Sequence, residues 1–198
     1  SDDELDAAKM AVVEANGIVD GYVRAFAWRG SEMMAISAQH TRTHVAIAAW
    51  EWPSYFDPEV KMKGITLDIS DWKRPSPESA PVNAKAAGLY MICTLSKHAA
   101  EKKGFQDALM LDYRGYIAEA TGANVFFVDG EGTIHTPIAD CFLDGITRRT
   151  VIALAESMQI KVVQRHLTLD DLSDMTECFL TGTAAEVTPV SQVGDHSF

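Results

Sequence analysis

Short strand-like runs separated by turn residues fill the middle of the chain and limit its fold more than any other feature. The runs span residues 64–70, 108–112, 116–118, 124–128 and 133–136. Glycine occurs in the breaks at 113–115 and 129–132, and such breaks between short runs predict antiparallel hairpins. A helix is predicted over 147–158, and strands over 161–165 and 177–180. The pattern predicts a mixed α/β fold of the α+β kind.

The stretch at residues 81–90 places Lys85 among small and apolar residues after a proline-rich run. Asn83 can cap a helix there, and apolar residues follow at helical spacing, at positions 89, 92, 95 and 99. Lys85 would then lie in the first turn, where the helix dipole opposes its charge and favours a nucleophilic amine. Most lysines are solvated surface residues, so Lys85 indicates a catalytic role only together with the stretches that accompany it.

Three later stretches supply groups that would accompany such a lysine. Tyr-Ile-Ala-Glu-Ala-Thr-Gly-Ala-Asn-Val-Phe at 116–126 places Glu119 between two strand-like runs. Gly-Ile-Thr-Arg at 145–148 leads into a helix whose free amides can hold a phosphate. Thr-Gly-Thr-Ala-Ala at 181–185 ends a strand with small residues and hydroxyls, a second candidate anion site. A lysine, a buried carboxylate and two phosphate cradles together are typical of a site for pyridoxal 5'-phosphate.

These four stretches, in this order, resemble the class IV, or fold-type IV, aminotransferases, and most closely the branched-chain amino acid aminotransferases. The resemblance covers essentially the whole chain. It implies a pyridoxal-phosphate enzyme that transfers amino groups between branched-chain L-amino acids (leucine, isoleucine or valine) and 2-oxoglutarate. In that family the residue matching Lys85 is catalytic and binds the cofactor covalently. The residue matching Glu119 faces the pyridine nitrogen, and the one matching Tyr90 bonds the phenolic oxygen. The phosphate is held by the residues that match Gly145, Ile146, Thr147 and Thr183.

Residues 22–28 alternate large and small side chains as a half-buried strand would, which places Tyr22, Arg24 and two further aromatic residues on one face. An arginine on a buried face needs an anionic partner, whereas an edge strand would leave it in solvent. The resemblance favours the first alternative, because branched-chain aminotransferases have Tyr-Ile-Arg here and the arginine serves a substrate carboxylate. The resemblance assigns substrate binding to four further positions, Trp52, Tyr55, Thr183 and Ala184.

The resemblance also implies two domains. A small N-terminal α/β domain is expected over residues 1–60, and a larger domain with a β-barrel-like core flanked by helices over residues 64–198. Ser-Asp-Asp-Glu at 1–4 is a capping box, so the chain begins on a helix. Family members carry several dozen residues before the matching helix, and the small domain is therefore expected to be incomplete in this chain. A loop of the neighbouring subunit completes the family's substrate pocket, which implies a homodimer at least.

Charge and cysteine usage restrict the classes of partner. The chain has 17 Lys and Arg against 28 Asp and Glu, a formal net charge of -11. Nucleic acids and anionic membranes need clustered positive charge, so neither is expected, whereas small-molecule amino acids and 2-oxo acids are. Cys93, Cys141 and Cys178 are widely spaced and form no metal-binding pattern. They indicate reduced thiols in a cytoplasmic protein without a metal site.

Other functions share this fold and cofactor. D-amino acid aminotransferases, amine transaminases and aminodeoxychorismate lyase have similar cofactor-binding stretches. They differ in the residues that bind the substrate carboxylate. From a different class, a catalytically silent relative could serve as a binding or oligomerisation partner. Tyr22, Arg24, Trp52 and Tyr55 favour the branched-chain enzymes, and the intact set of Lys85, Glu119 and Thr147 disfavours a silent relative.

Overall fold

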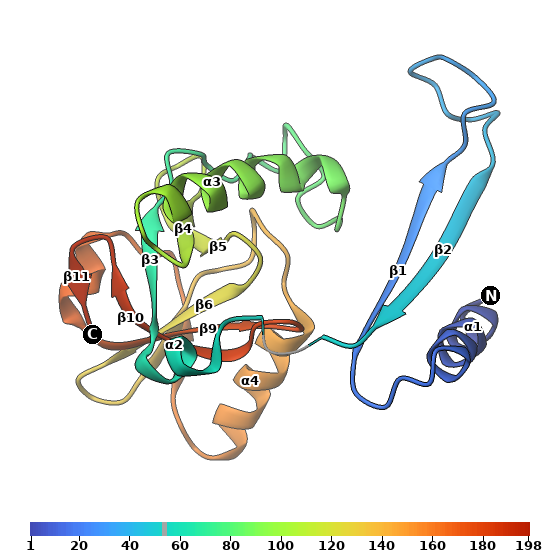
Figure 1. Ribbon diagram of the computed structural model, residues 1–198. Coiled ribbons are helices and arrows are strands. Elements are labelled where there is room, and N and C mark those ends of the chain that lie inside the picture. The colour runs from blue at the N-terminus through green and yellow to red at the C-terminus, as the bar shows by residue number, and fades with distance from the viewer. Residues whose placement is uncertain (53–54) are drawn as a thin grey trace. The chain divides into compact units, whose positions relative to one another are not determined.

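The computed structural model describes residues 1–52 and 55–198, which form two compact units, Ser1–Tyr55 and Phe56–Phe198. The smaller unit consists of helix α1 (Asp2–Ala15) and a hairpin of strands β1 (Tyr22–Arg29) and β2 (Thr43–Trp50) (Figure 1). The capping box of α1 is confirmed. The Ser1 side chain accepts a hydrogen bond from the Glu4 amide, and the Glu4 carboxylate accepts one from the Ser1 amino group. The strand predicted over residues 22–28 is also present, as β1.

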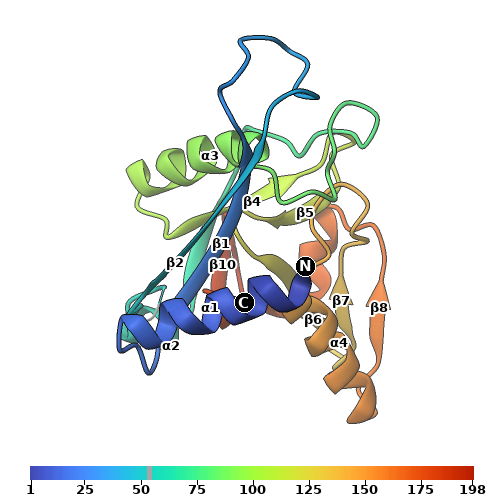
Figure 2. The same cartoon turned by 90° about the vertical axis from the view of Figure 1, so that its right-hand side faces the viewer.

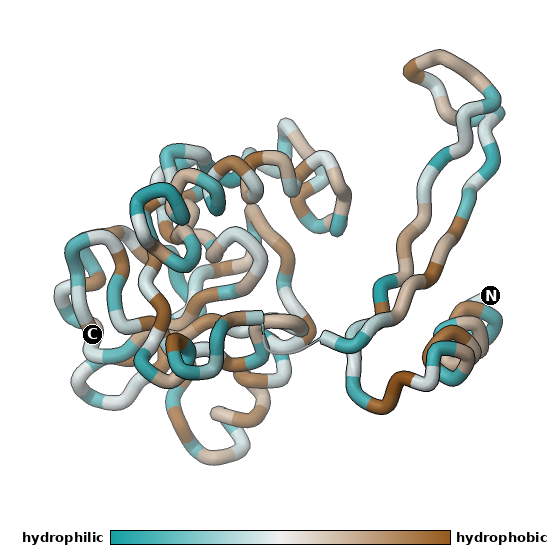
Figure 3. Tube along the Cα trace, in the orientation of Figure 1, coloured by the Kyte–Doolittle hydropathy of each residue, from teal (hydrophilic) through white to brown (hydrophobic). Residues whose placement is uncertain are grey.

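Strand β1 of the smaller unit is mostly exposed rather than half-buried as predicted. None of the described residues in this unit is buried, and Phe26 and Trp28 are 46% and 47% exposed. Figure 3 shows apolar and polar positions interspersed along both of its strands. The expected buried aromatic face around Arg24 is therefore wrong for the unit as it stands, since a two-stranded ribbon with one helix has too few elements to cover it.

The larger unit is a nine-stranded mixed sheet with helices around it, and the expected mixed fold with a barrel-like core is confirmed. The strand order is β5-β4-β3-β10-β9-β6-β7-β8, with β11 paired to β10. Its elements, in chain order, are α2 (Pro58–Lys63), β3 (Ile65–Ile69), the 3-10 helix η1 (Ala87–Leu89), α3 (Tyr90–Lys102), β4 (Asp107–Leu111), β5 (Ile117–Ala120), β6 (Asn124–Asp129), β7 (Ile134–Thr136), α4 (Ile146–Ser157), β8 (Val162–Gln164), the 3-10 helix η2 (Asp170–Asp174), β9 (Met175–Gly182), β10 (Glu186–Val193) and β11 (His196–Ser197).

Both predicted hairpins are present, as the antiparallel pairs β4–β5 and β6–β7. The parallel pairs β3–β4, β3–β10 and β7–β8 were not predicted, because they join segments distant in sequence. The curled sheet encloses a core of fully buried side chains that includes Leu67, Leu109, Phe127 and Leu180. Helix α3 packs on β3 and β4, and α4 packs on β8 and β9 (Figure 2).

Helix α3 begins later than predicted. It starts at Tyr90 and follows η1, so Asn83 does not cap it and Lys85 precedes its first turn by five residues. Its buried face is also different, because Cys93, Ser96 and Ala100 are buried whereas Leu95 is 42% exposed. Small side chains bring this helix close to the sheet, and the Ser96 hydroxyl lies 2.6 Å from that of Ser70.

None of the helices in the described part of the chain is both long enough and apolar enough to cross a membrane.

Candidate active site

Glu119 is a buried carboxylate in the middle of a fully buried strand. It lies in β5 and is 8% exposed. Its Oε1 lies 3.3 Å from the Arg74 Nε, and its Oε2 accepts a hydrogen bond of 3.4 Å from the Asn124 side-chain amide. Burial raises the pKa of Glu119 to about 8, and the positive charges of Arg74 and Lys85 oppose this rise. The site thus contains an acid that is poised between its neutral and ionised forms near neutral pH.

Lys85 lies in an irregular segment between Pro81 and η1, and its side chain is exposed. The predicted position in a helical turn with apolar surroundings is wrong, because the helix starts only at Tyr90. Its ammonium group lies 5.7 Å from the centre of the Tyr90 ring, and its charge acts on Glu119. The structure therefore places the exposed amine of Lys85 beside the Tyr90 ring, where its charge acts on the buried carboxylate of Glu119.

The start of helix α4 offers free backbone amides. Gly145 is its N-cap, no side chain caps the helix, and its first turn contains no acidic residue. Ile146 and Thr147 are the first two helical residues, so their amides have no partner within the helix. Such amides and the helix dipole favour an anion. A larger residue at Gly145 would force the Asn124 side chain to move, since a Cβ there would lie 2.4 Å from its oxygen.

The second candidate anion site is the turn between β9 and β10. Thr183 and Ala184 lie in this turn, directly after Gly182 ends β9. Gly182 packs against Ala123, the residue before β6. The turn therefore lies beside the segment that carries Asn124. Thr181, two residues before Thr183, is paired with Asn124 in the ladder of β6 and β9.

Two arginines fix the loop that leads into α4. Arg148 is buried and donates to the side chains of Asp144 and Gln164 and to the Pro137 carbonyl, at 2.7, 2.8 and 2.9 Å. Arg114 bridges the carboxylates of Asp112 and Asp140 at 2.7 and 2.8 Å. These bonds connect the loop between residue 137 and the helix start to the neighbouring segments.

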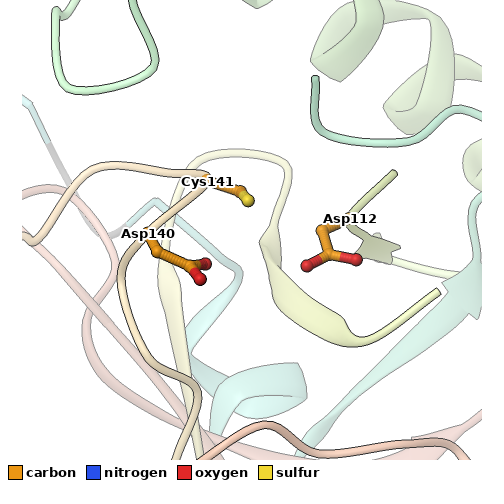
Figure 4. Close-up of side chains that lie close together, drawn as sticks. All are labelled: Asp112, Asp140 and Cys141. Atoms are coloured by element: carbon orange, nitrogen blue, oxygen red, sulfur yellow. The ribbon is translucent and has the colours of Figure 1, made fainter. Parts of the chain in front are cut away.

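The group of Asp112, Asp140 and Cys141 in Figure 4 has the donor atoms of a metal site, within 4.8 Å of one another. The guanidinium of Arg114 already bonds both carboxylates and lies 3.5 Å from the Cys141 sulfur. Burial and the neighbouring Asp140 raise the pKa of Cys141 to about 12, so its thiol stays protonated at neutral pH. The group is therefore explained as an ion-pair anchor for the loop.

The remaining predicted residues belong to the smaller unit. Tyr22, Trp52 and Tyr55 form one aromatic cluster, with ring centres 4.8 Å apart for Tyr22 and Trp52 and 6.2 Å apart for Trp52 and Tyr55. Arg24 is exposed on β1, opposite Ala48 of β2. The role of these four residues in substrate binding stays a prediction.

Sequence reasoning missed Arg74 and Asn124. Arg74 lies at the start of the proline-rich run before Lys85, yet it is 4% exposed and donates to the Cys93 sulfur besides its contact with Glu119. Asn124 opens an apolar strand, and a polar side chain in such a strand must find buried partners. That requirement was the available signal for Asn124, whereas the partners of Arg74 lie too far along the chain to be read from spacing.

Comparison with known proteins identifies the family. The family model "Amino-transferase class IV" matches residues 1–193. This chain belongs to that family. A probable branched-chain-amino-acid aminotransferase of Rickettsia conorii is 42% identical over 96% of the chain and 64% of the relative, and the Escherichia coli K12 enzyme is 36% identical over 96% and 62%. The family resemblance inferred from the sequence is confirmed.

Solved structures agree with this assignment. The structure of the Escherichia coli branched-chain amino acid aminotransferase has a TM-score of 0.95 at 36% identity, over 100% of this chain and 65% of that one. The structure of the Thermobaculum terrenum branched-chain amino acid aminotransferase in its PLP-form has a TM-score of 0.89 at 29% identity, over 100% and 64%. The expected fold type IV is confirmed, and the chain spans just under two thirds of the length of these relatives.

The raised pKa of Glu119 predicts a pH dependence of stability. Between pH 4.5 and about 8 the folded protein without added ligands keeps a proton that the unfolded chain loses. The stability linked to this proton is fully present below pH 4.5 and is lost as the pH rises through about 8, by on the order of 4 kcal/mol. Glu119→Gln should remove this component, so that its free energy of unfolding, measured in denaturant, falls less over the range.

The exposed Glu131, in the turn after β6, provides the control, and Glu131→Gln should follow the parent. A Glu119→Gln protein whose stability runs parallel to the parent from pH 4.5 to 8 would show that Glu119 does not hold this proton.

Proposed function

We propose that this chain belongs to a pyridoxal-phosphate-dependent aminotransferase that acts on branched-chain L-amino acids, with 2-oxoglutarate as the amino acceptor. The observation that carries the proposal is the exposed amine of Lys85, whose charge acts on the buried carboxylate of Glu119, in a unit that also presents the uncapped start of α4. These residues fit the cofactor, since they offer an amine for its aldehyde, a carboxylate for its ring nitrogen and amides for its phosphate. The names of the relatives support the substrate class.

When bound, the cofactor supplies a ring that withdraws electrons from the α-carbon of the substrate. Lys85 holds the cofactor and, once released as a free amine, moves a proton at the substrate α-carbon. Glu119 keeps a proton on the ring nitrogen, and it does so best in its ionised form. A positively charged ring nitrogen would act in the same direction as Arg74 and Lys85, which already favour that form.

Four groups of residues bind the remaining parts of cofactor and substrate in this proposal. Tyr90 bonds the phenolic oxygen, and its ring lies beside Lys85 as this role requires. Gly145, Ile146, Thr147 and Thr183 hold the phosphate through amides and hydroxyls. The amides of Thr183 and Ala184 hold the substrate α-carboxylate. Tyr22, Trp52 and Tyr55 accept the branched side chain, and their mutual contacts support a shared apolar surface.

The location and assembly follow from the same proposal. We expect a cytoplasmic protein, because all three cysteines are free and buried. We expect a homodimer at least. The exposed aromatic side chains of the hairpin support this, since monomers seldom expose such surfaces.

The first test replaces the proposed catalytic amine. Lys85→Ala should lower the rate of L-leucine transamination by at least about 10³-fold, because it removes the group that holds the cofactor and moves the proton. The visible absorbance of bound cofactor should be lost at the same time. The matched control is Lys161→Ala, which changes an exposed lysine just before β8. Retained turnover in Lys85→Ala would refute the assignment.

The second test separates the two substrates. Only glutamate and 2-oxoglutarate carry a second carboxylate, and we assign this group to Arg24. Arg24→Gln should slow the glutamate half-reaction by about 10²-fold, as expected for about 2 to 3 kcal/mol of a charged hydrogen bond, and should change the leucine half-reaction much less. Arg42→Gln, an exposed arginine of the same unit, is the control. Equal losses in both half-reactions would instead place Arg24 at the α-carboxylate or in the scaffold.

The third test concerns assembly. Light scattering of the intact protein should give the mass of a dimer or a larger oligomer at the concentrations used for the assay. A monomer that still transaminates at nanomolar concentration would show that a neighbouring subunit is not needed.

A further inference from the structure

One buried side chain touches both ends of the proposed cofactor site. Asn124 is 5% exposed and is the first residue of β6. Its Nδ2 donates to the Leu143 carbonyl at 2.9 Å and to the Glu119 Oε2 at 3.4 Å. Its Oδ1 accepts a hydrogen bond of 3.2 Å from the Gly145 amide. A single carboxamide therefore links the carboxylate in β5 to the loop that starts α4.

The chemistry of these three contacts requires an asparagine. Glu119 and the Leu143 carbonyl both need a donor, whereas the Gly145 amide needs an acceptor. An aspartate would supply the acceptor but no donor, and an aliphatic residue would supply neither. The space between Asn124 and Gly145 is also restricted, because a Cβ added at Gly145 would lie 2.4 Å from the Asn124 Oδ1. A movement of the Asn124 side chain must therefore move both Glu119 and the loop.

The surroundings of Asn124 support a role toward a ligand. Its ladder partner Thr181 lies on the same face of the sheet, since residues directly opposite in a ladder share a face. The Thr181 hydroxyl is buried and has no hydrogen-bond partner in the described parts of the chain. A buried polar atom without a hydrogen-bond partner lowers the stability of the folded protein, so packing alone does not account for it. This face of β6 and β9 holds more polar groups than its own packing satisfies.

We propose that Asn124 is a positioning residue that couples the two ends of the cofactor site, by holding Glu119 at the ring-nitrogen end and the Gly145 loop at the phosphate end. The inference rests on the proposed function. Its consequence is that the two ends are not independent, so that occupancy of one stabilises the geometry of the other.

Two ligands distinguish the contribution of the ring-nitrogen end from that of the phosphate end. Pyridoxal has the same ring and aldehyde as pyridoxal 5'-phosphate but lacks the phosphate, so the ratio of their affinities reports the phosphate end. Asn124→Ala should weaken pyridoxal binding by about 10-fold and should also lower the affinity ratio by about 10-fold, because both links are lost. Asn124→Asp keeps an acceptor for the Gly145 amide and places a second carboxylate beside Glu119. It should weaken pyridoxal binding while leaving the ratio within about 3-fold of the parent.

Equilibrium titration of the intact protein, followed by the absorbance of the bound ligand, provides these affinities. Thr176→Val, which changes an exposed side chain of β9 that donates to the Val128 carbonyl of β6, is the control for general disturbance of the β6–β9 pair and should keep the parent's ratio. An Asn124→Ala protein with unchanged pyridoxal affinity or an unchanged ratio would overturn the coupling. A parent protein that binds neither ligand would instead refute the proposed function, so the two failures are distinct.

A measurement on the unaltered protein covers the case in which the Asn124 variants do not fold. Hydrogen exchange of the backbone amides at residues 143–147 is read with and without saturating pyridoxal. Since pyridoxal has no phosphate, slower exchange of these amides is expected only if the ring end and the loop are coupled. Unchanged exchange in the presence of bound pyridoxal would overturn the proposal.

Discussion

The cost of burying the Glu119 carboxylate governs the arrangement of the residues around it. An ionised carboxylate in a buried strand loses its hydration, and the protein compensates with the guanidinium of Arg74, the charge of Lys85 and the amide of Asn124. The compensation is incomplete, which is why the pKa of Glu119 remains as high as about 8. Arg74 contributes charge more than a directed bond, because its Nε lies 3.3 Å from the carboxylate yet is not aligned for a hydrogen bond to any group that the structure describes. A carboxylate left in this state gains from one further positive partner, and a protonated ring nitrogen is such a partner.

The start of α4 depends on a different kind of support. Backbone amides bind an anion well only when they are already fixed in place, since ordering a loop on binding reduces the affinity. Arg148 ties the helix to Asp144, Pro137 and Gln164, and Arg114 ties the preceding loop to Asp112. The Arg148 guanidinium is buried, but its partner Asp144 is 43% exposed and Asp140, the partner of Arg114, is 37% exposed, so solvent screens both ion pairs.

The sequence predicted those parts of the fold that depend on neighbours along the chain. The hairpins β4–β5 and β6–β7 and the helix α4 follow from alternation, turn residues and helical spacing, and all three are present. The position of Lys85 was missed because the short 3-10 helix η1 precedes α3, and a capping residue at Asn83 could not reveal it. The buried face of α3 was missed because close packing on the sheet favours the small residues Ser96 and Ala100 over Leu95. Glu119 was found from its motif, but Arg74 lies 45 residues earlier and no local pattern connects the two.

Electrostatics explains why the proposed site relies on local features. The chain carries a net charge of -11, so its overall field repels a phosphate or a carboxylate. Two local features of the site attract an anion despite this negative net charge. Lys85 and Arg74 bring two positive charges to one buried carboxylate, which leaves the centre of the site with a positive excess. The uncapped start of α4 and the turn after β9 add partial positive charges from backbone amides, which no acidic residue in the first turn of α4 neutralises. Because these fields act only over a few ångströms, binding of an anion at the proposed site requires the amine, the amides and the carboxylate to keep their relative positions. The Asn124 side chain connects the Gly145 amide and the carboxylate directly.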